Sequence, residues 1–218
     1  MNDGDWLERR NKAMKHPAQQ AIEGLPHLGG GHWVYDLYPV RGDIARIVEP
    51  CSVFEFGAML GWALVAFALG PEKPPTRIGW VDDESHTADS NRCVRENLRS
   101  IPALSHTRLS PYFNTFDALA FRQADLVAVD SDHSLDGTMR DLLVAYRLKP
   151  RVIVIDDMDA IREVREASLN FARWLKLPLW HVGTHNGLGY LDLSGTEEIA
   201  DGLERMGYHR PDSLPLTP

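Results

Sequence analysis

The feature that most constrains the fold is a repeated alternation of short apolar runs with longer segments of helical length. Five runs rich in Val, Ile and Leu predict strands at residues 52–56, 77–81, 107–109, 125–129 and 152–155. Segments of helical length follow the first four runs, at residues 60–69, 87–98, 114–121 and 135–147. Strands with so little polar alternation are typical of a sheet covered on both faces. This order predicts an α/β fold, with a Rossmann-like, doubly wound and mostly parallel sheet.

The C-terminal part of the chain follows a different pattern. Two further strands are expected at residues 179–182 and 188–193, on either side of Asn186-Gly187. An Asn-Gly pair between two apolar runs is a hairpin signal, so this end of the sheet should be antiparallel. A helix at residues 197–206 and a proline-rich tail follow.

The N-terminal part is expected to be helical. Residues 1–23 and 41–49 have helical patterns, and three consecutive glycines at 29–31 mark a break between them. We therefore expect an N-terminal helical lid or extension over residues 1–45. The main domain should cover residues 46–218.

Composition restricts the classes of partner. The 218 residues carry a formal net charge of −8, whereas nucleic acids and anionic membranes attract basic surfaces, so we expect neither as a partner. Cys51 and Cys93 form no CxxC pair, and no disulfide framework or zinc site is expected. The first sixteen residues lack the apolar core of a signal peptide, and the apolar run at 58–69 is too short to cross a bilayer. These patterns favour a cytoplasmic protein, with homo-oligomer formation left open.

The sequence VFEFGAMLGWAL, residues 53–64, places a carboxylate and two glycines where the first strand turns into a helix. Gly57 and Gly61 allow a sharp turn and the close approach of a ligand. Their E-x-G-x-x-x-G spacing matches neither G-x-G-x-x-G nor a P-loop, which weakens a dinucleotide or phosphate interpretation. Glu55 suits a cationic ligand group, and the acidic run at 82–84 suits ribose hydroxyls. S-adenosylmethionine (SAM) has a ribose, a positive end and no phosphate, so we predict it as the cofactor. The alternative is a glycine-rich turn without a ligand, of the kind that occurs in most α/β proteins.

Three carboxylates stand at the carboxyl ends of two predicted strands. Asp130 ends the fourth strand, and Asp156 and Asp157 end the fifth. Left uncompensated, these groups would repel one another, and a hard divalent cation such as Mg²⁺ would relieve the repulsion. The alternative is that one or two of them cap helices, a role that better suits Asp132 and Asp136.

A histidine follows the first of these carboxylates. His133 lies three residues after Asp130. Imidazole titrates near neutral pH, which makes His133 a candidate general base. The alternative is a loop histidine that hydrogen-bonds to the backbone.

These motifs resemble those of a known family. Residues 52–193 resemble class I SAM-dependent methyltransferases and, among these, the metal-dependent small-molecule O-methyltransferases of the macrolide-sugar and catechol types. EFGAMLGW resembles their first cofactor motif, VDSDHSLDGTMRDL resembles their IDGDHSYEGVxxDL segment, and HNGLGYL resembles their closing hairpin. The chain departs from the pattern in having Pro150-Arg151 for Pro-Gly-Gly, Asp156-Asp157 for the Asp-Asn of catechol enzymes, and no Gly-Asp after the third strand.

The resemblance implies roles for individual residues. The implied cofactor-binding residues are Glu55, Phe56, Gly57, Ala58, Gly61, Asp82, Asp83, Asp130 and Ser131. The implied metal ligands are Asp130, Asp156 and Asp157. His133, assisted by Asp130, stands where macrolide-sugar enzymes place a histidine base and catechol enzymes a lysine.

The implied activity is methyl transfer from SAM to a hydroxyl of a small molecule, such as a natural-product intermediate. Mg²⁺ would orient the hydroxyl, and His133 would take its proton. One alternative keeps the fold without the metal, as an N- or C-methyltransferase or another SAM-using enzyme. Another is a non-catalytic binding or scaffold subunit. An NAD dehydrogenase is least expected, because the glycine spacing is wrong.

Overall fold

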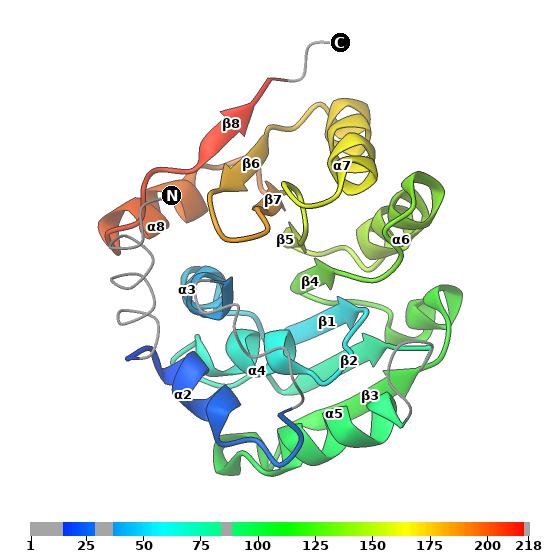
Figure 1. The fold of residues 1–218 in the computed structure, drawn as a ribbon, viewed down its shortest axis with the longest axis vertical. Helices are drawn as coiled ribbons and strands as arrows, with labels where there is room; N and C mark the ends of the chain where they lie inside the picture. The colour runs from blue at the N-terminus through cyan, green and yellow to red at the C-terminus, as the bar shows by residue number, and fades with distance from the viewer. Residues whose placement is uncertain (1–14, 29–36, 84–88, 216–218) are drawn as a thin grey trace.

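The computed structural model describes residues 15–28, 37–83 and 89–215. Five strands lie where the apolar runs predict them, namely β1 (Ser52–Phe56), β2 (Arg77–Val81), β3 (Arg108–Tyr112), β4 (Leu126–Val129) and β5 (Val152–Ile155). The C-terminal strands of the described chain are β6 (Leu179–Val182), β7 (Leu188–Asp192) and β8 (Asp212–Leu214). Together they form one sheet in the order β3-β2-β1-β4-β5-β7-β6-β8 (Figure 1).

The first five strands pair in parallel, and the C-terminal end of the sheet is antiparallel. β1 pairs with β2 and β4, β2 pairs with β3, and β4 pairs with β5. β7 runs antiparallel to both β5 and β6, and β8 runs antiparallel to β6. The predicted fold is therefore confirmed. Because the chain moves outward from β1 to β3 and then returns to place β4 beside β1, these two strands form the switch point where such sheets bind ligands.

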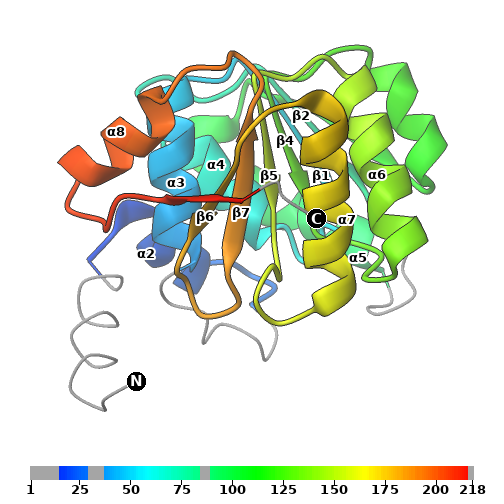
Figure 2. The same cartoon turned by 90° about the horizontal axis from the view of Figure 1, so that it is seen from above.

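Helices cover both faces of the sheet (Figures 1 and 2). One face carries α2 (Pro17–Glu23), α3 (Leu37–Val48), α4 (Trp62–Leu69), α5 (Ser90–Arg99) and α8 (Glu198–Arg205). The other face carries α6 (Leu135–Arg147), α7 (Arg162–Leu175) and the 3₁₀ segment η2 (Thr115–Phe121). A short 3₁₀ segment, η1 (Pro102–Leu104), precedes β3. Within β1, Val53 packs into the first core and Phe54 into the second, which explains the continuous apolar run.

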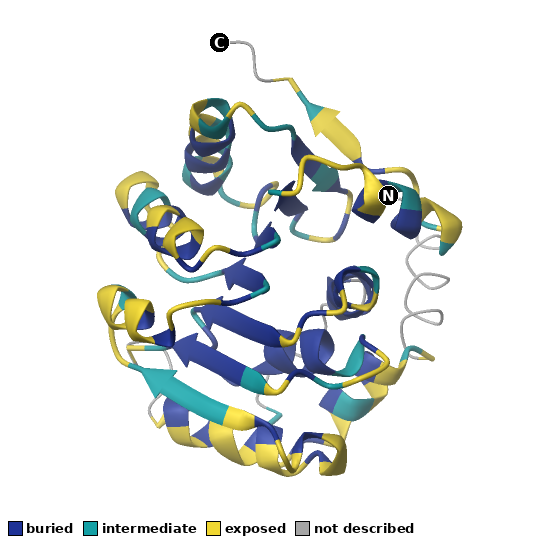
Figure 3. Cartoon of the chain, turned by 180° about the vertical axis from the view of Figure 1, so that it is seen from behind, coloured by how far each residue is buried: buried dark blue, intermediate teal, exposed yellow. Residues whose placement is uncertain are grey.

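Burial follows position in the sheet. β1, β4, β5 and β7 are buried at every residue, whereas β3 and β8, the two edges, are exposed or half-buried (Figure 3). The edge position also explains a wrong boundary. The strand predicted at 107–109 continues to Tyr112 across Pro111. Proline has no N–H to donate to a neighbouring strand, and an edge strand tolerates this because one of its two sides has no neighbour.

Three elements differ from the sequence-based expectation. α7 is missing from the predicted elements, although its buried residues follow helical spacing: Val164, Ala167, Ser168, Phe171 and Ala172. β8 forms within the proline-rich tail, where no strand was predicted, and it pairs with β6. The segment at 114–121 is a 3₁₀-helix, with Asn114 as its N-cap, rather than an α-helix.

The N-terminal part is helical where the structure describes it. α2 lies within the helical stretch expected at 1–23, and α3 begins before the helix expected at 41–49. α3 packs against α4 and α8, so it belongs to the core of the molecule. The expected glycine break lies outside the described residues. Among the helices that the structure describes, none is both long and apolar enough to span a bilayer.

Candidate active site

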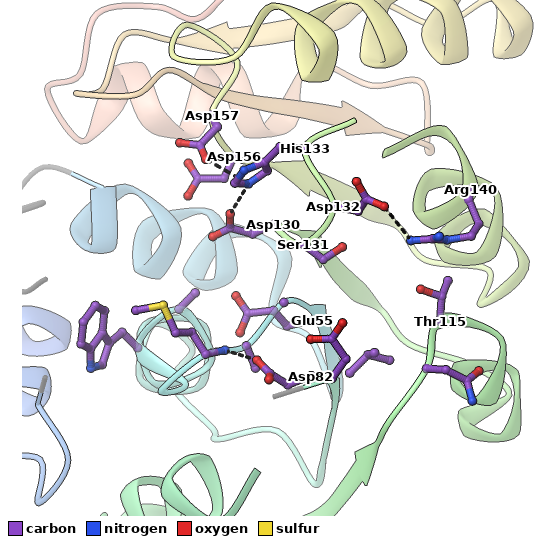
Figure 4. Close-up of a pocket in the computed structure, with 18 of the residues that line it drawn as sticks. Glu55, Asp82, Thr115, Asp130, Ser131, Asp132, His133, Arg140, Asp156 and Asp157 are labelled. Atoms are coloured by element: carbon purple, nitrogen blue, oxygen red, sulfur yellow. Dashed lines mark hydrogen bonds and ion pairs between the residues drawn. The ribbon is translucent and has the colours of Figure 1, made fainter. Parts of the chain in front are cut away.

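A cavity of about 1170 Å³ opens at the carboxyl ends of β1, β2, β4 and β5. Its walls come from α3, the β1–α4 turn, the segments after β2 and β3, the β4–α6 loop, the end of β5 and the β6–β7 hairpin. Figure 4 shows carboxylates from several of these segments turned toward one another. Most of the predicted site residues line it: Glu55, Gly57, Ala58, Asp82, Asp83, Asp130, Ser131, His133, Asp156 and Asp157.

Two of the predicted cofactor residues, Phe56 and Gly61, do not line this cavity. Phe56 is fully buried in the core beneath α6 and α7. Gly61 stands at the start of α4 with φ of +78°, where an added Cβ would lie 3.1 Å from a methyl group of Val94. Both residues therefore lie outside the cavity wall, in the packing around the β1–α4 turn.

The turn after β1 needs a glycine for a reason that the sequence does not reveal. Gly57 has a φ of +82°, and a Cβ at this position would lie 1.9 Å from the carbonyl oxygen of Asp130. From the sequence, this glycine is expected to make room for a ligand. In the structure, the backbone after β4 fills that space. Gly57 therefore lets the ends of β1 and β4 approach each other at the switch point.

Glu55 is a buried carboxylate facing the cavity. It is only 1% exposed, and its Oε2 has no hydrogen-bond partner among the described residues. Burial raises the pKa of Glu55 to about 8, and the charge of Arg41 offsets part of this rise. A buried carboxylate without a partner costs free energy, and a cationic ligand group would offset that cost.

Asp82 follows β2 and holds the neighbouring segments together. Its Oδ2 accepts a hydrogen bond from the backbone N–H of Met59 at 2.7 Å (Figure 4), and its Oδ1 accepts one from Ser90 Oγ at 2.5 Å. Asp83, the next residue, is exposed and also lines the cavity. Asp82 therefore presents a carboxylate at the cavity wall, and carboxylates are acceptors for hydroxyl protons.

Asp130 and Asp157 both lie close to the imidazole of His133. Its Nε2 is 3.2 Å from Asp157 Oδ2 and 3.8 Å from Asp130 Oδ1 (Figure 4). Asp130 raises the pKa of His133 and the charge of Asp157 adds to this, whereas burial opposes it. Asn186, from the β6–β7 hairpin, donates a hydrogen bond to Asp157 Oδ1 at 2.8 Å. The ring of His133 is thus held by acids and remains 45% exposed, within reach of a ligand.

Arg41 is a site residue that the sequence-based prediction misses. Its Nη2 lies 2.5 Å from Asp156 Oδ2 and 3.4 Å from Asp130 Oδ2, and its side chain is only 3% exposed. Burial raises the pKa of Asp156, and Arg41 acts against that rise. An arginine that directly follows the apolar residues 37–40 was the available signal, since a buried charge needs a partner.

One group of donors among the described residues is spaced to hold a metal ion. Ligand atoms of Asp130, His133 and Asp157 all lie within 4.8 Å of one another. Asp156, the third expected ligand, does not belong to this group. Its Oδ2 contacts Arg41, and its Oδ1 is buried without a partner in the described chain. These side chains therefore do not fit the three-aspartate cage that the resemblance implies.

The β4–α6 loop is fixed by hydrogen bonds to buried carboxylates and backbone. Ser131 Oγ donates to the buried carboxylate of Asp141. Ser134 caps α6, because its Oγ accepts the N–H of the third helical residue at 3.0 Å. The capping role expected for Asp132 or Asp136 is therefore wrong. Asp132 instead accepts the N–H of Ser134 at 2.9 Å.

Comparisons with solved structures agree with this architecture. No protein-family model and no curated protein sequence matches the chain. The O-methyltransferase TomG from Streptomyces achromogenes, involved in tomaymycin synthesis and solved with SAM, superposes with a TM-score of 0.60 at 14% identity, covering 88% of this chain and 98% of that one. For an O-methyltransferase from Bacillus cereus in complex with S-adenosylhomocysteine (SAH), the TM-score is 0.53 at 15% identity, and the match covers 88% of this chain and 92% of that one. For SAH-bound PaMTH1, a methyltransferase from Podospora anserina, the TM-score is 0.55 at 13% identity, and the match covers 88% of each chain. The chain has the class I methyltransferase fold.

Proposed function

We propose that this protein is a SAM-dependent methyltransferase that acts on a hydroxyl group of a small molecule. One observation carries the proposal: one cavity at the β1/β4 switch point contains both Glu55, a buried carboxylate whose Oε2 has no hydrogen-bond partner among the described residues, and His133, an accessible histidine held by acids. The first suits a cationic cofactor, and the second suits proton removal. The SAM and SAH complexes of proteins with this fold support the same assignment.

The cofactor would lie across the carboxyl ends of β1 and β2. Glu55 would pair with the ammonium group of the methionine part. Asp82, which accepts a hydrogen bond from the backbone N–H of Met59, would accept further hydrogen bonds from the ribose hydroxyls. This arrangement uses the acidic residues of the cavity and requires no phosphate-binding loop, in agreement with the glycine spacing.

The acceptor would lie beside His133. Because Nε2 faces Asp157, Nδ1 is the ring atom available to take the hydroxyl proton. The acceptor oxygen then forms a bond to the methyl carbon as the carbon–sulfur bond breaks, which leaves SAH. Since the sulfonium is already activated, positioning and deprotonation should provide most of the acceleration.

Magnesium assistance is a second candidate for the same site. The spacing of donor atoms from Asp130, His133 and Asp157 favours it. A bound Mg²⁺ would supply Lewis-acid polarisation of the acceptor hydroxyl. However, a histidine that ligates a metal through Nε2 is constrained as a base, and Asp156 is already engaged by Arg41. The proposed methyl transfer therefore involves no metal ion.

Ligand binding tests the cofactor assignment first. We expect SAM and SAH to raise Tm by mass action and NAD, the control ligand, to leave it unchanged. Glu55→Ala should weaken SAM binding in calorimetry, whereas Glu166→Ala, an exposed glutamate on α7, should not. If neither SAM nor SAH binds at about 1 mM, which would correspond to a binding free energy weaker than about −4 kcal/mol, the proposal fails.

Labelled methyl transfer then tests the acceptor class. SAM with a tritiated methyl group, incubated with panels of small hydroxyl and amine compounds, should label the hydroxyl panel. Mass fragmentation of the product distinguishes O-methylation from N- or C-methylation. Binding of SAM without transfer to any panel would favour the scaffold alternative.

A further inference from the structure

The acidic side of the cavity already contains a cation, the guanidinium of Arg41. Its Nη2 contacts Asp156 Oδ2 at 2.5 Å and Asp130 Oδ2 at 3.4 Å. These two aspartates come from the ends of β5 and β4, the two strands whose carboxylates were expected to share a divalent ion. The guanidinium thus lies against the carboxylates between which that ion was expected.

The surroundings of Arg41 hold it in this position. Its side chain is 3% exposed, and its Cζ lies 5.8 Å from the ring of Tyr38 and 5.9 Å from the ring of Phe67. Both distances are within the range of a cation–π contact. A guanidinium does not lose its proton in proteins, so a metal ion cannot displace it by deprotonation, as it could a lysine.

The third carboxylate also has protein partners. Asp157 Oδ2 lies 3.2 Å from His133 Nε2, and its Oδ1 accepts a hydrogen bond from Asn186 at 2.8 Å. Each of the three carboxylates is therefore already in contact with a cation or an amide donor. A divalent ion here would have to lie close to the fixed charge of Arg41 and replace these partners.

We propose that Arg41 is the resident cation of this acidic cluster and that it takes the place of a divalent metal. In this role Arg41 is a positioning residue: it holds Asp130 and Asp156 side by side, and through Asp130 it helps to orient His133. The consequence for turnover rests on the proposed methyl transfer, which should then proceed in the presence of a chelator.

Metal binding tests this inference without any acceptor. Titration with Mn²⁺, followed by electron paramagnetic resonance, should show no site in the wild-type protein tighter than about 1 mM, the weak end of known carboxylate sites. Arg41→Met keeps an unbranched side chain at this position but removes the charge. It should gain one Mn²⁺ site at least about tenfold tighter, because Asp130 and Asp156 then lose their cation.

Matched variants locate the effect. Arg46→Met, at an exposed arginine on the same helix, should behave like the wild type. Asp156→Asn combined with Arg41→Met should abolish the gained site. A wild-type Mn²⁺ site tighter than about 1 mM that Asp156→Asn removes would overturn the inference. So would a folded Arg41→Met variant without any gain. If circular dichroism shows that Arg41→Met does not fold, the wild-type titration decides alone.

The same samples separate this inference from the proposed function. SAH should raise the Tm of the wild type equally with EDTA and with Mg²⁺. If SAH has no effect under either condition, the proposed function fails while the Mn²⁺ result still stands. If SAH binds only with Mg²⁺, the cofactor assignment survives and the role given to Arg41 is wrong.

Discussion

Two clusters of buried charge share helix α3 but differ in how far the protein satisfies them. The structural cluster consists of Asp43, His16 and Tyr208. Tyr208 Oη donates to Asp43 Oδ2 at 2.7 Å, and His16 Nε2 lies 3.4 Å from Asp43 Oδ1. Both carboxylate oxygens thus have partners, and these link α3 to α2 and to the segment after α8. Such a cluster holds helices together.

The pocket cluster has the opposite character. Its members are Glu55, Arg41, Asp130, Asp156, Asp157 and His133. Three of its buried polar atoms have no hydrogen-bond partner among the described residues, namely Glu55 Oε2, Arg41 Nε and Asp156 Oδ1. Buried polar groups are normally paired, so three unpaired atoms from residues that line one cavity favour a ligand there.

The pKa values of one acid from each cluster show the same contrast. Burial tends to raise the pKa of Asp43, but hydrogen bonds from His16 and Tyr208 outweigh it and leave the pKa lowered. Burial raises the pKa of Glu55 to about 8, because Arg41 offsets it only in part. Asp43 therefore stabilises the fold when ionised, whereas ionised Glu55 destabilises it.

The largest expected effect is on catalysis by the pocket cluster. His133→Ala should lower the rate of methyl transfer by roughly 10²–10⁴-fold, the usual scale for a general base. SAH affinity and Tm should stay close to wild type, because the side chain is half-exposed and outside the core. Single-turnover kinetics with labelled SAM would measure the rate. His106→Ala, at an exposed histidine that does not line the cavity, is the control. An unchanged rate for His133→Ala would rule out its role as the base.

The next effect is on cofactor affinity. Asp82→Ala should weaken SAH binding by about 1.5–3 kcal/mol, the scale for hydrogen bonds to a charged group. Part of this loss arises indirectly, because the loop that includes Met59 loses its anchor. Calorimetry with SAH measures the change, and Asp83→Ala should have little effect. If the two variants show the reverse pattern, Asp83 is the residue that binds the ribose.

Most of the fold could be predicted because the signal is local and repeated. The central strands are apolar at successive positions since both faces are covered, and Asn186-Gly187 predicts the hairpin. The edge strands of the sheet were harder to predict from the sequence. β8 has little apolar character of its own and forms by pairing with β6. In β3, Pro111 interrupts the strand pattern, so the end of the strand at Tyr112 was missed. α7 was missed although Val164 and Phe171 follow helical spacing, so its signal was present.

The candidate site could be predicted only where topology fixes it. Parallel strands bring their carboxyl ends to one edge, so Asp130 and Asp156 had to be neighbours. Arg41 comes from a helix without a motif, and only tertiary packing turns its side chain toward these acids. The role of Gly57 depends on the distance to another strand end, which sequence spacing does not encode.

A smaller effect should appear in the structural cluster, on stability alone. Asp43→Asn should lower the free energy of unfolding by about 1–2 kcal/mol at pH 7, because it removes charge-assisted hydrogen bonds. The lowered pKa of Asp43 determines how this stability difference depends on pH. The stability contributed by ionised Asp43 is present above its ordinary value of 3.8 and is lost as the pH falls through the lowered value.

Urea denaturation of both proteins at several pH values measures this difference. The gap between wild type and Asp43→Asn should shrink as the solution becomes more acidic than pH 4, and SAH affinity should not change. If the stability difference instead stays constant into acid, packing, and not the charge of Asp43, holds α2, α3 and the segment after α8 together.

The smallest effect has the opposite sign and comes from the pocket cluster. Glu55→Gln should raise the free energy of unfolding by about 1 kcal/mol near pH 8, because it removes a buried carboxylate that lacks a partner. The pKa of Glu55 is 4.5 in the unfolded chain and about 8 in the folded protein. The free-energy cost of burying the ionised carboxylate is therefore absent below pH 4.5, grows as the pH rises, and levels off above pH 8. Denaturation curves from pH 5 to 9 should show the gain increasing with pH, while calorimetry shows weaker SAM binding. If Glu55→Gln destabilises the protein at every pH, Glu55 is satisfied within the fold, and the contrast between the two clusters disappears.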